Sequence, residues 1–124
     1  AKKFDTIFLL MNGIGLIRRL EYINAFFEKV NELLSPDGQL IFDSSDIIYM
    51  YKEDDGSYRI NLNEAYYGEV NFSIAYKNQY FTSFPWIYID FQTMAEYAEK
   101  NAFEAELISR GDHFDYLARI KRKQ

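Results

Sequence analysis

Two apolar segments on either side of one amphipathic stretch, all within residues 4–43, restrict the fold more than any other feature of the sequence. Residues 7–11 are continuously apolar, which is typical of a strand buried on both faces of a parallel sheet. Apolar residues then recur at helical spacings of three and four: Leu20, Ile23, Phe27, Val30 and Leu34. Residues 39–43 form the second apolar segment. Strand, helix and strand in this order predict a βαβ unit with a right-handed crossover.

The predicted helix ends where Pro36 and Gly38 occur in the sequence Ser-Pro-Asp-Gly. Proline lacks the amide hydrogen that a continuing helix needs, and glycine tolerates the left-handed backbone that often closes a helix. We therefore expect a turn over residues 35–38 before the second strand begins.

Residues 47–89 have a different character, because apolar and polar residues alternate in two runs, at residues 58–63 and 70–76. A third run, residues 81–89, is rich in aromatic residues and is interrupted by Pro85. Turn sequences such as Asp-Asp-Gly-Ser at residues 54–57 separate the runs. This pattern predicts an antiparallel meander of three or four strands, inserted after the second strand.

Helical spacing returns after Asp90, a suitable N-cap residue, and Asn101 stands where a left-handed C-terminal cap is expected. Two short strands follow, at residues 104–109 and 114–120. The predicted fold class is α/β: a partial doubly wound, Rossmann-like sheet of parallel strands with an antiparallel last strand, plus the inserted meander at about residues 47–89. We expect a single domain over residues 1–124.

Composition excludes several classes of site. The net charge of −5 argues against a nucleic-acid partner, and we expect the basic residues 119–123 to be a solvated terminal strand or tail. The sequence has no cysteine, which rules out disulfides, thiolate zinc sites and cysteine nucleophiles. No cluster has metal-ligand spacing, so we expect no metal site. The apolar runs are too short for a membrane span and no signal-peptide pattern is visible, so we expect no membrane partner and a cytoplasmic location.

Three local motifs occur in order along the chain. Phe-Asp-Thr-Ile at residues 4–7 opens the first strand, Leu-Leu-Ser-Pro-Asp-Gly at residues 33–38 precedes the second, and Asn-Ala-Phe at residues 101–103 follows the last helix. With the order of elements, these motifs resemble the fourth to seventh strands of class I S-adenosylmethionine-dependent methyltransferases, which form the C-terminal half of that fold. The family often has glycine where Asn101 stands, so the chain departs from the pattern there.

The resemblance implies S-adenosylmethionine as the cofactor of a full-length parent enzyme. Ligands of doubly wound sheets bind beyond the carboxyl ends of the parallel strands. The resemblance therefore assigns four residues to the cofactor edge: Leu10, Met11, Asn12 and Gly13. The family's glycine-rich loop and ribose-binding acidic residue belong to its first two strands and have no counterpart in this sequence. We expect a truncated domain that is inactive alone and binds the cofactor very weakly or not at all.

The substrate side is expected after the second strand and in the meander. Asp43 and Asp46 are candidates for a base and its orienting group, and Asp46 could equally cap a short helix. Four aromatic residues could form a wall against a flat substrate or the sulfonium, or could only pack across strands: Tyr49, Tyr66, Tyr67 and Trp86. The one histidine, His113, is interpreted as a solvent-exposed turn residue, and no residue is assigned as catalytic.

Two other interpretations stay open. The chain could be a non-catalytic α/β binding or dimerisation module that uses the aromatic meander, or part of a different doubly wound enzyme with a phosphate-bearing ligand. For a methyltransferase, the methyl acceptor would be a small molecule or a protein. In a truncated domain, residues 4–11 would leave an unpaired apolar strand edge, which predicts a homodimer through this edge.

Overall fold

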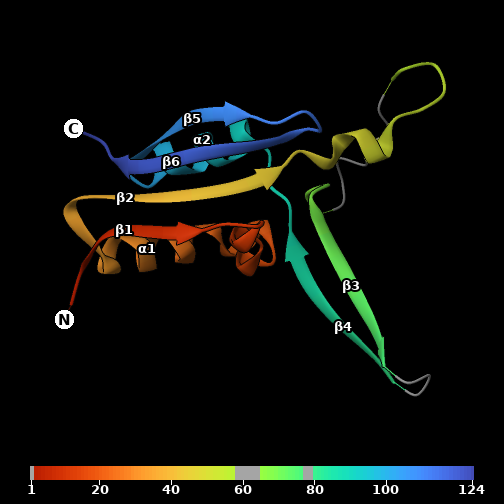
Figure 1. Cartoon of the computed structure of the whole chain (residues 1–124), viewed down its shortest axis with the longest axis horizontal. Helices are drawn as coiled ribbons and strands as arrows, with labels where there is room; N and C mark the ends of the chain where they lie inside the picture. The colour runs from red at the N-terminus through yellow and green to blue at the C-terminus, as the bar shows by residue number, and fades with distance from the viewer. Residues whose placement is uncertain (1, 58–64, 77–79) are drawn as a thin grey trace.

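The computed structural model describes residues 2–57, 65–76 and 80–124. Its helices and strands follow the chain as β1 (Phe4–Leu9), η1 (Gly13–Ile17), η2 (Leu20–Tyr22), α1 (Ile23–Leu33), β2 (Leu34–Ser45), η3 (Ile47–Tyr51), β3 (Glu69–Tyr76), β4 (Tyr80–Ile87), α2 (Phe91–Lys100), β5 (Phe103–Arg110) and β6 (Asp115–Arg122). Four strands form one sheet, and β3 and β4 form a separate hairpin (Figure 1). None of the described helices has the length and apolar character needed to cross a membrane.

The four-stranded sheet has the order β1-β2-β6-β5. Strands β1 and β2 are parallel, and β6 is antiparallel to both of its neighbours. The predicted βαβ unit is therefore present as β1, α1 and β2. The closing antiparallel strand is inserted between β2 and β5 rather than added at the edge. The predicted α/β fold class is confirmed.

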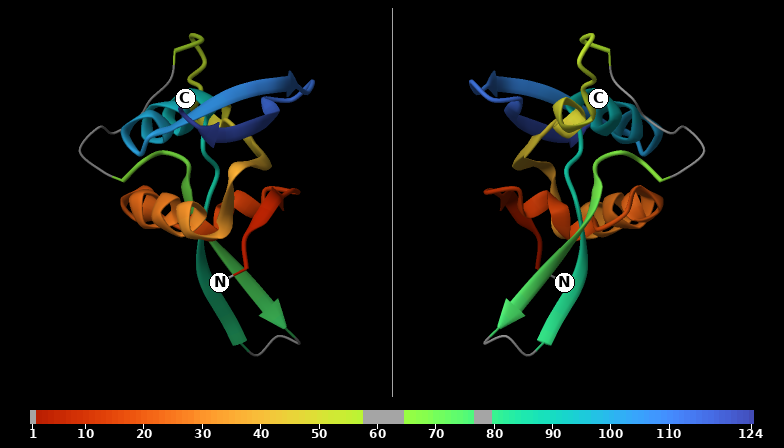
Figure 2. Two further views of the ribbon diagram at one scale, coloured as in Figure 1. Left: turned by 90° about the vertical axis from the view of Figure 1, so that its left-hand side faces the viewer. Right: turned by 90° about the vertical axis from the view of Figure 1, so that its right-hand side faces the viewer.

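Both α helices cover the same face of the sheet, as the two side views in Figure 2 show. The alternation of side chains along β2 explains the division of the two faces. Leu40, Phe42 and Ser44 are buried, whereas the intervening Ile41 and Asp43 are only partly buried. From the helix layer, the Phe27 ring lies 5.5 Å from the ring of Phe103 at the start of β5. The hydrophobic core thus lies between one layer of helices and one face of the sheet.

Strand β2 begins at Leu34, before the turn that the sequence predicts, and not at Gln39. Residues 35–38 form an irregular segment inside the strand, because Phe4 pairs with Leu34 and Thr6 pairs with Gln39. A Cβ atom at Gly38 would lie 2.7 Å from Leu34 Cγ and 3.0 Å from the Phe4 backbone oxygen, so the close approach of β1 requires glycine. The residues that suggested a turn produce a bulge in the strand.

The structure confirms the predicted cap at the N-terminus of α2 but not the one at its C-terminus. Asp90 caps the N-terminus as predicted, since its carboxylate accepts a hydrogen bond from the Thr93 N–H at 3.0 Å. The prediction of a left-handed Asn101 is wrong: its φ is −107°, and the next residue, Ala102, has a φ of 65°. Asn101 closes the helix through its side chain, which donates to the Tyr97 backbone oxygen at 2.8 Å.

The basic residues 119–122 lie in the terminal strand β6, which is one of the two predicted alternatives, but they are partly buried rather than solvated. The Arg122 guanidinium donates five hydrogen bonds of 2.6–3.3 Å to oxygens at the end of α1 and the start of β2: Asn31 O and Oδ1, Leu34 O, Ser35 O and Pro36 O. Its neighbours Arg119 and Lys123 pair with Glu106 and Glu99. Arg122 therefore joins the last strand to the βαβ unit.

The inserted segment projects away from the sheet as the hairpin β3–β4 (Figure 1). Its strands pair antiparallel from Glu69 opposite Ile87 to Tyr76 opposite Tyr80. Within the described part of the chain, the predicted meander is therefore two strands. The alternating run at residues 58–63 lies outside the described residues.

Candidate functional site

One carboxylate holds the chain that leaves β1. Asp43 Oδ2 accepts a hydrogen bond from the Met11 backbone N–H at 2.8 Å, and Oδ1 accepts one from the Asn12 N–H at 2.6 Å. Both donors lie in the left-handed region, with φ values of 56° and 57°. That conformation costs about 1–2 kcal/mol for a residue other than glycine, and hydrogen bonds to a charged acceptor offset the cost. Asp43 therefore fixes the turn after β1.

The Asn12 side chain joins this turn to the base of the hairpin. Its Nδ2 donates to the Ile87 backbone oxygen at 3.3 Å, and its Oδ1 accepts a hydrogen bond from Ser44 Oγ at 2.8 Å. The buried Ser44 Oγ also accepts a hydrogen bond from the Ile89 N–H at 3.1 Å. The Tyr116 hydroxyl donates to the Ile89 backbone oxygen at 2.5 Å. One polar network thus connects β1, β2 and β6 with the end of β4.

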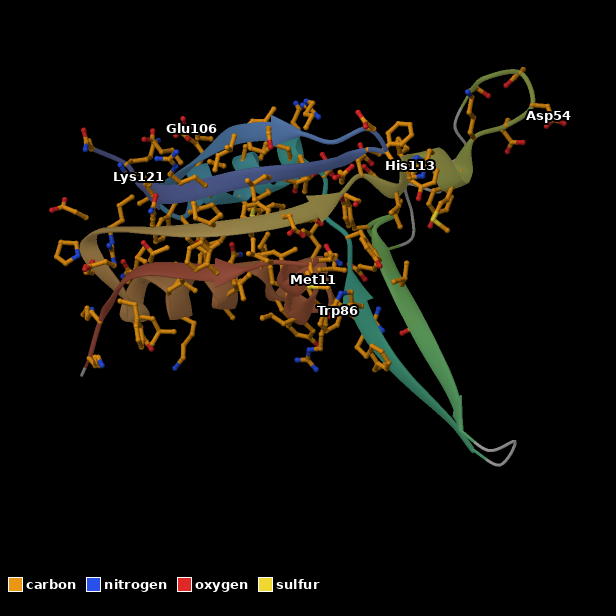
Figure 3. All side chains as sticks on the ribbon, viewed as in Figure 1. Met11, Asp54, Trp86, Glu106, His113 and Lys121 are labelled. Atoms are coloured by element: carbon orange, nitrogen blue, oxygen red, sulfur yellow. The ribbon has the colours of Figure 1, made fainter. Side chains whose placement is uncertain are left out.

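The base of the hairpin packs against η1 through Trp86, which is labelled in Figure 3. A Cβ atom at Gly15 would lie 1.9 Å from Trp86 Nε1, so the indole rests directly on the Gly15 backbone. The hairpin therefore lies at the carboxyl ends of β1 and β2. This is the end of the sheet where the sequence predicts the insertion.

Two consecutive tyrosines before β3 donate hydrogen bonds to aspartates. The Tyr67 hydroxyl donates to Asp46 Oδ1 at 2.6 Å, and the Tyr66 hydroxyl donates to Asp90 Oδ1. Burial raises the pKa of both phenols above the ordinary value of 10, and the carboxylate acceptors raise each pKa further. At neutral pH both phenols are protonated and act as donors.

The two candidate aspartates have different partners. Both Asp43 oxygens hold backbone amides of the turn after β1. Asp46 Oδ1 accepts a hydrogen bond from the Ile48 N–H at 3.0 Å, as well as the one from Tyr67. The capping alternative for Asp46 is therefore confirmed, because this contact closes the first turn of η3.

An apolar hollow of about 450 Å³ lies beside η3, with Tyr49, Met50 and Tyr88 among its lining residues. The Tyr49 ring stacks on Phe114, with ring centroids 4.8 Å apart, and its edge contact with His113 has a centroid distance of 5.1 Å. His113 is exposed, as predicted. Its ring contacts with Tyr49 and Phe114 also make it part of an aromatic cluster.

A second hollow, of about 380 Å³, shares Ser45 with the first. Its lining is polar and includes Asp43, Arg110 and Asp115. The two hollows therefore present an apolar and a polar surface on either side of the end of β2. Within the described residues, no group of three or more His, Asp or Glu side chains could hold a metal ion.

The four residues predicted for the cofactor edge lie together after β1. Leu10 and Met11 expose their side chains, with Met11 94% exposed, while Asn12 turns into the polar network. The Gly13 N–H donates to the Leu10 backbone oxygen at 3.0 Å, which closes a tight turn. His113 lies away from this turn in Figure 3, beyond the end of β2.

Ser44 and Tyr116 belong to the network and were not among the predicted site residues. Both occupy positions where the alternation of a strand points into the core: Ser44 follows Leu40 and Phe42, and Tyr116 precedes Ala118. A polar group at a core-facing position, next to the end of a strand, is the signal that could have identified them.

Comparison with known proteins gives this geometry a context. No family model and no curated protein sequence matches the chain. A solved structure of an S-adenosylmethionine-dependent methyltransferase from Bacteroides fragilis, in complex with S-adenosyl-L-homocysteine, is 48% identical over 100% of this chain, with a TM-score of 0.89. The chain is a relative of the S-adenosylmethionine-dependent methyltransferases. It spans 50% of the length of that methyltransferase chain.

Two more distant solved structures share the fold. The DhpI–SAH complex is 12% identical with a TM-score of 0.63, and covers 98% of this chain and 48% of its own. An S-adenosylmethionine-dependent methyltransferase from Clostridium acetobutylicum ATCC 824 is 12% identical with a TM-score of 0.60, and covers 99% of this chain and 60% of its own. The methyltransferase resemblance of the three sequence motifs is thus confirmed at the level of the fold.

Proposed function

We propose that this chain forms the substrate side and part of the cofactor edge of an S-adenosylmethionine-dependent methyltransferase. The observation that carries the proposal is the 48% identity, over the whole chain, to a methyltransferase solved with S-adenosyl-L-homocysteine. That likeness, with a TM-score of 0.89, extends over the whole chain and therefore includes the segments after β1 and at the end of β2.

The geometry after β1 suits one side of a cofactor site. S-adenosylmethionine, when bound, supplies a methyl group activated by the positive charge of its sulfonium. The residues of a methyltransferase mainly align the acceptor with this group and exclude water, because the reaction is an in-line displacement. The turn of Leu10, Met11, Asn12 and Gly13 offers exposed apolar side chains on a backbone that Asp43 holds rigid.

Asp46 is better placed than Asp43 to accept a proton from a methyl acceptor. Both Asp43 oxygens already accept backbone hydrogen bonds, whereas the described contacts of Asp46 both use Oδ1. Asp46 also directly precedes η3, beside the apolar hollow that Tyr49 lines. In this proposal, Tyr67 orients Asp46 by donating to it, and the hollow receives the acceptor, which is a small molecule or a protein side chain.

Titration calorimetry with S-adenosylmethionine tests the proposal in two steps. The chain alone should bind the cofactor very weakly or not at all, and micromolar binding by the chain alone would contradict this division of the site. A protein that joins this chain to the half of the Bacteroides fragilis enzyme that it does not cover should bind the cofactor. Failure of the joined protein, correctly folded, to bind would refute the proposal.

Two variants of the joined protein locate the site. Asn12→Ala should weaken cofactor binding about tenfold, because it removes the side-chain hydrogen bonds that hold the turn to Ile87 and Ser44. His113→Ala should change the affinity less than about twofold, because His113 lies in the aromatic cluster near η3. Equal effects of the two substitutions would contradict the assignment of the cofactor edge.

A further inference from the structure

The polar hollow of about 380 Å³ lies where β2 and β5 end and β6 begins (Figure 1). Three consecutive residues from each of these places line it: residues 43–45, 109–111 and 115–117. The register of the sheet explains this grouping, because Leu117 pairs with Asp43 on one side and with Ser109 on the other. None of the described lining residues belongs to β1 or to the turn after it. The hollow is therefore separate from the predicted cofactor edge.

A bulge in β5 decides which of its side chains line the hollow. The pairing with β6 shifts between Leu107 and Ser109, which leaves Ile108 as an extra residue in β5. Without the bulge, Ile108 would stand opposite Leu117. With the bulge, Ser109 takes that position and Arg110 follows it in the lining. The irregularity thus replaces an apolar side chain by a polar one at this place.

Part of the lining belongs to the open face of the sheet, which is the face that carries no helix among the described residues (Figure 2). Asp43 alternates with the core residue Phe42, so its side chain points to the open face. Directly opposite residues of antiparallel strands lie on the same face, which places Leu117 and Ser109 there as well. The polar hollow is therefore lined from a side that no described helix covers.

The hollow combines one cation with two carboxylates. No described carboxylate forms an ion pair with the exposed Arg110. Asp115 Oδ1 accepts a hydrogen bond from the His113 N–H at 3.2 Å, whereas Oδ2 accepts none among the described contacts. A Cβ atom at Gly111 would lie 2.2 Å from Asp115 Oδ2, so glycine leaves the room that this carboxylate occupies. Both oxygens of Asp43 are held by the turn after β1. A guanidinium and Asp115 Oδ2 are thus the groups that the hollow offers to a ligand.

These groups favour a ligand that carries both charges close together. A guanidinium binds a carboxylate through two parallel hydrogen bonds, and a carboxylate attracts an ammonium group. A simple amine would leave Arg110 unpaired, and a simple carboxylate would leave Asp115 unpaired. A phosphate monoester carries almost two negative charges at neutral pH, and Asp43 and Asp115 would repel it. The head group of an α-amino acid satisfies both charged groups of the hollow.

We propose that the polar hollow binds the ammonium and carboxylate groups of an α-amino acid, and that this head group belongs to the methyl acceptor. The apolar hollow beside η3 shares Ser45 with the polar one, so an apolar side chain on the same molecule extends past Ser45 into it. Only the identification of this molecule as the acceptor rests on the proposed function. The cofactor also ends in an α-amino acid, but its place in that function is the turn after β1.

Amide chemical shifts of the isotope-labelled chain measure this binding and locate it. The probe is L-phenylalanine, and the matched ligands are phenylethylamine, which lacks the carboxylate, and phenylpropionate, which lacks the ammonium. L-phenylalanine should bind at least about fivefold more tightly than either, because it alone makes both charge-assisted contacts. Its largest shifts should fall on the amides of Arg110 and Gly111 rather than on those of Met11 and Asn12. If the chain alone is unstable, the joined protein is titrated in the same way.

Two variants with matched controls test each charge separately. Arg110→Gln should weaken the binding of L-phenylalanine about fivefold and that of phenylethylamine less than about twofold, since phenylethylamine has no carboxylate. Asp115→Asn should weaken L-phenylalanine about fivefold and phenylpropionate less than about twofold, since phenylpropionate has no ammonium. Arg18→Gln and Asp112→Asn make the same chemical changes at exposed positions outside the hollow, and should change each affinity less than about twofold. Circular dichroism melting establishes that all four variants fold like the parent chain.

In the joined protein, L-phenylalanine and S-adenosyl-L-homocysteine should bind together, as an acceptor and a spent cofactor must. Displacement of one by the other would overturn the proposal, because the amino-acid site would then be that of the cofactor. L-phenylalanine that binds no more tightly than its two matched ligands would also overturn it, as would variants that behave like their controls. None of these measurements needs methyl transfer. A joined protein that binds L-phenylalanine but not the cofactor would therefore count against the proposed function and leave the amino-acid site in place.

Discussion

Replacement of Asp43 by asparagine should destabilise the protein by loosening the turn after β1. The side chain keeps its size but loses its charge and one of its two acceptor oxygens. The Met11 and Asn12 amides now share that carboxylate at 2.8 and 2.6 Å, so in the variant one of them would face an amide NH₂ group. The left-handed backbone of both residues would then be stabilised by fewer hydrogen bonds.

The size of the effect follows from these two contacts. A hydrogen bond to a charged group contributes about 1.5–3 kcal/mol, and one to a neutral group about 0.5–1.5 kcal/mol. Asp43→Asn removes one charged bond and converts the other to a neutral one, which gives a gross loss of about 2.5–4.5 kcal/mol. Because Asp43 is partly exposed and water can replace some of this loss, we expect a decrease of about 2 kcal/mol in the free energy of unfolding.

Urea unfolding followed by circular dichroism measures this difference. Asp54→Asn is the matched control, because it makes the same chemical change on an exposed loop beyond η3, remote from the turn (Figure 3). The control should change the free energy of unfolding by no more than about 0.5 kcal/mol. A loss for Asp43→Asn as small as that of the control would show that the turn holds its conformation without the carboxylate, and the reasoning would be refuted.

Three further substitutions or conditions test other parts of the structure. Arg122→Lys keeps the charge but cannot make five hydrogen bonds, so the free energy of unfolding should fall by about 2–3 kcal/mol in urea titrations; no change would contradict the joining role of Arg122. Gly15→Ala should displace the indole of Trp86, the one tryptophan, and shift its fluorescence emission. Gly13→Ala should not, because its Cβ would meet its nearest neighbour at 3.6 Å. Burial raises the pKa of Tyr66, so the folded protein holds this proton more tightly than the unfolded chain, and stability should fall as the pH rises above about 10. A Tyr66→Phe variant should lose less stability over that range, and equal slopes of the urea midpoint against pH would argue against this cause.

The sequence predicts the βαβ unit, the capped second helix and the closing strands because period and capping are local properties. It does not predict the start of β2, because Pro36 and Gly38 have the same chemistry in a turn and in a bulge. Only the pairing of Phe4 with Leu34, which lies far away in the sequence, decides between the two. The role of Arg122 was missed for a related reason, since its acceptors are mostly backbone oxygens, which carry no signal in the sequence.

The sequence predicts where the candidate site lies better than it predicts what each of its residues does. Asp43 ends the predicted second strand and Asp46 follows it three residues later, so the sequence suggests a pair, yet each accepts hydrogen bonds from other groups. Their separation follows from the backbone after β2, where Asp46 caps η3 and takes the Tyr67 hydroxyl. That hydroxyl comes from a tyrosine doublet at residues 66 and 67, and no periodicity of the sequence relates this doublet to the end of β2.

The end of β2 shows how two adjacent residues can hold one turn from both faces of a sheet. The parallel register places Leu9 beside Phe42, so the chain that leaves β1 passes next to Asp43 and Ser44. Neighbouring residues of a strand point to opposite faces. Asp43 binds the backbone of the turn from the open face, and Ser44 binds the Asn12 side chain from the helix face. The side chains of a strand can bind a neighbouring segment in this way only where that segment leaves the sheet. Its backbone amides are then no longer paired with a strand and can donate to side chains. The position of the turn beyond the last paired residue of β1 is therefore what allows two short side chains to fix it. It is also why the exposed Met11 side chain is presented on a rigid backbone.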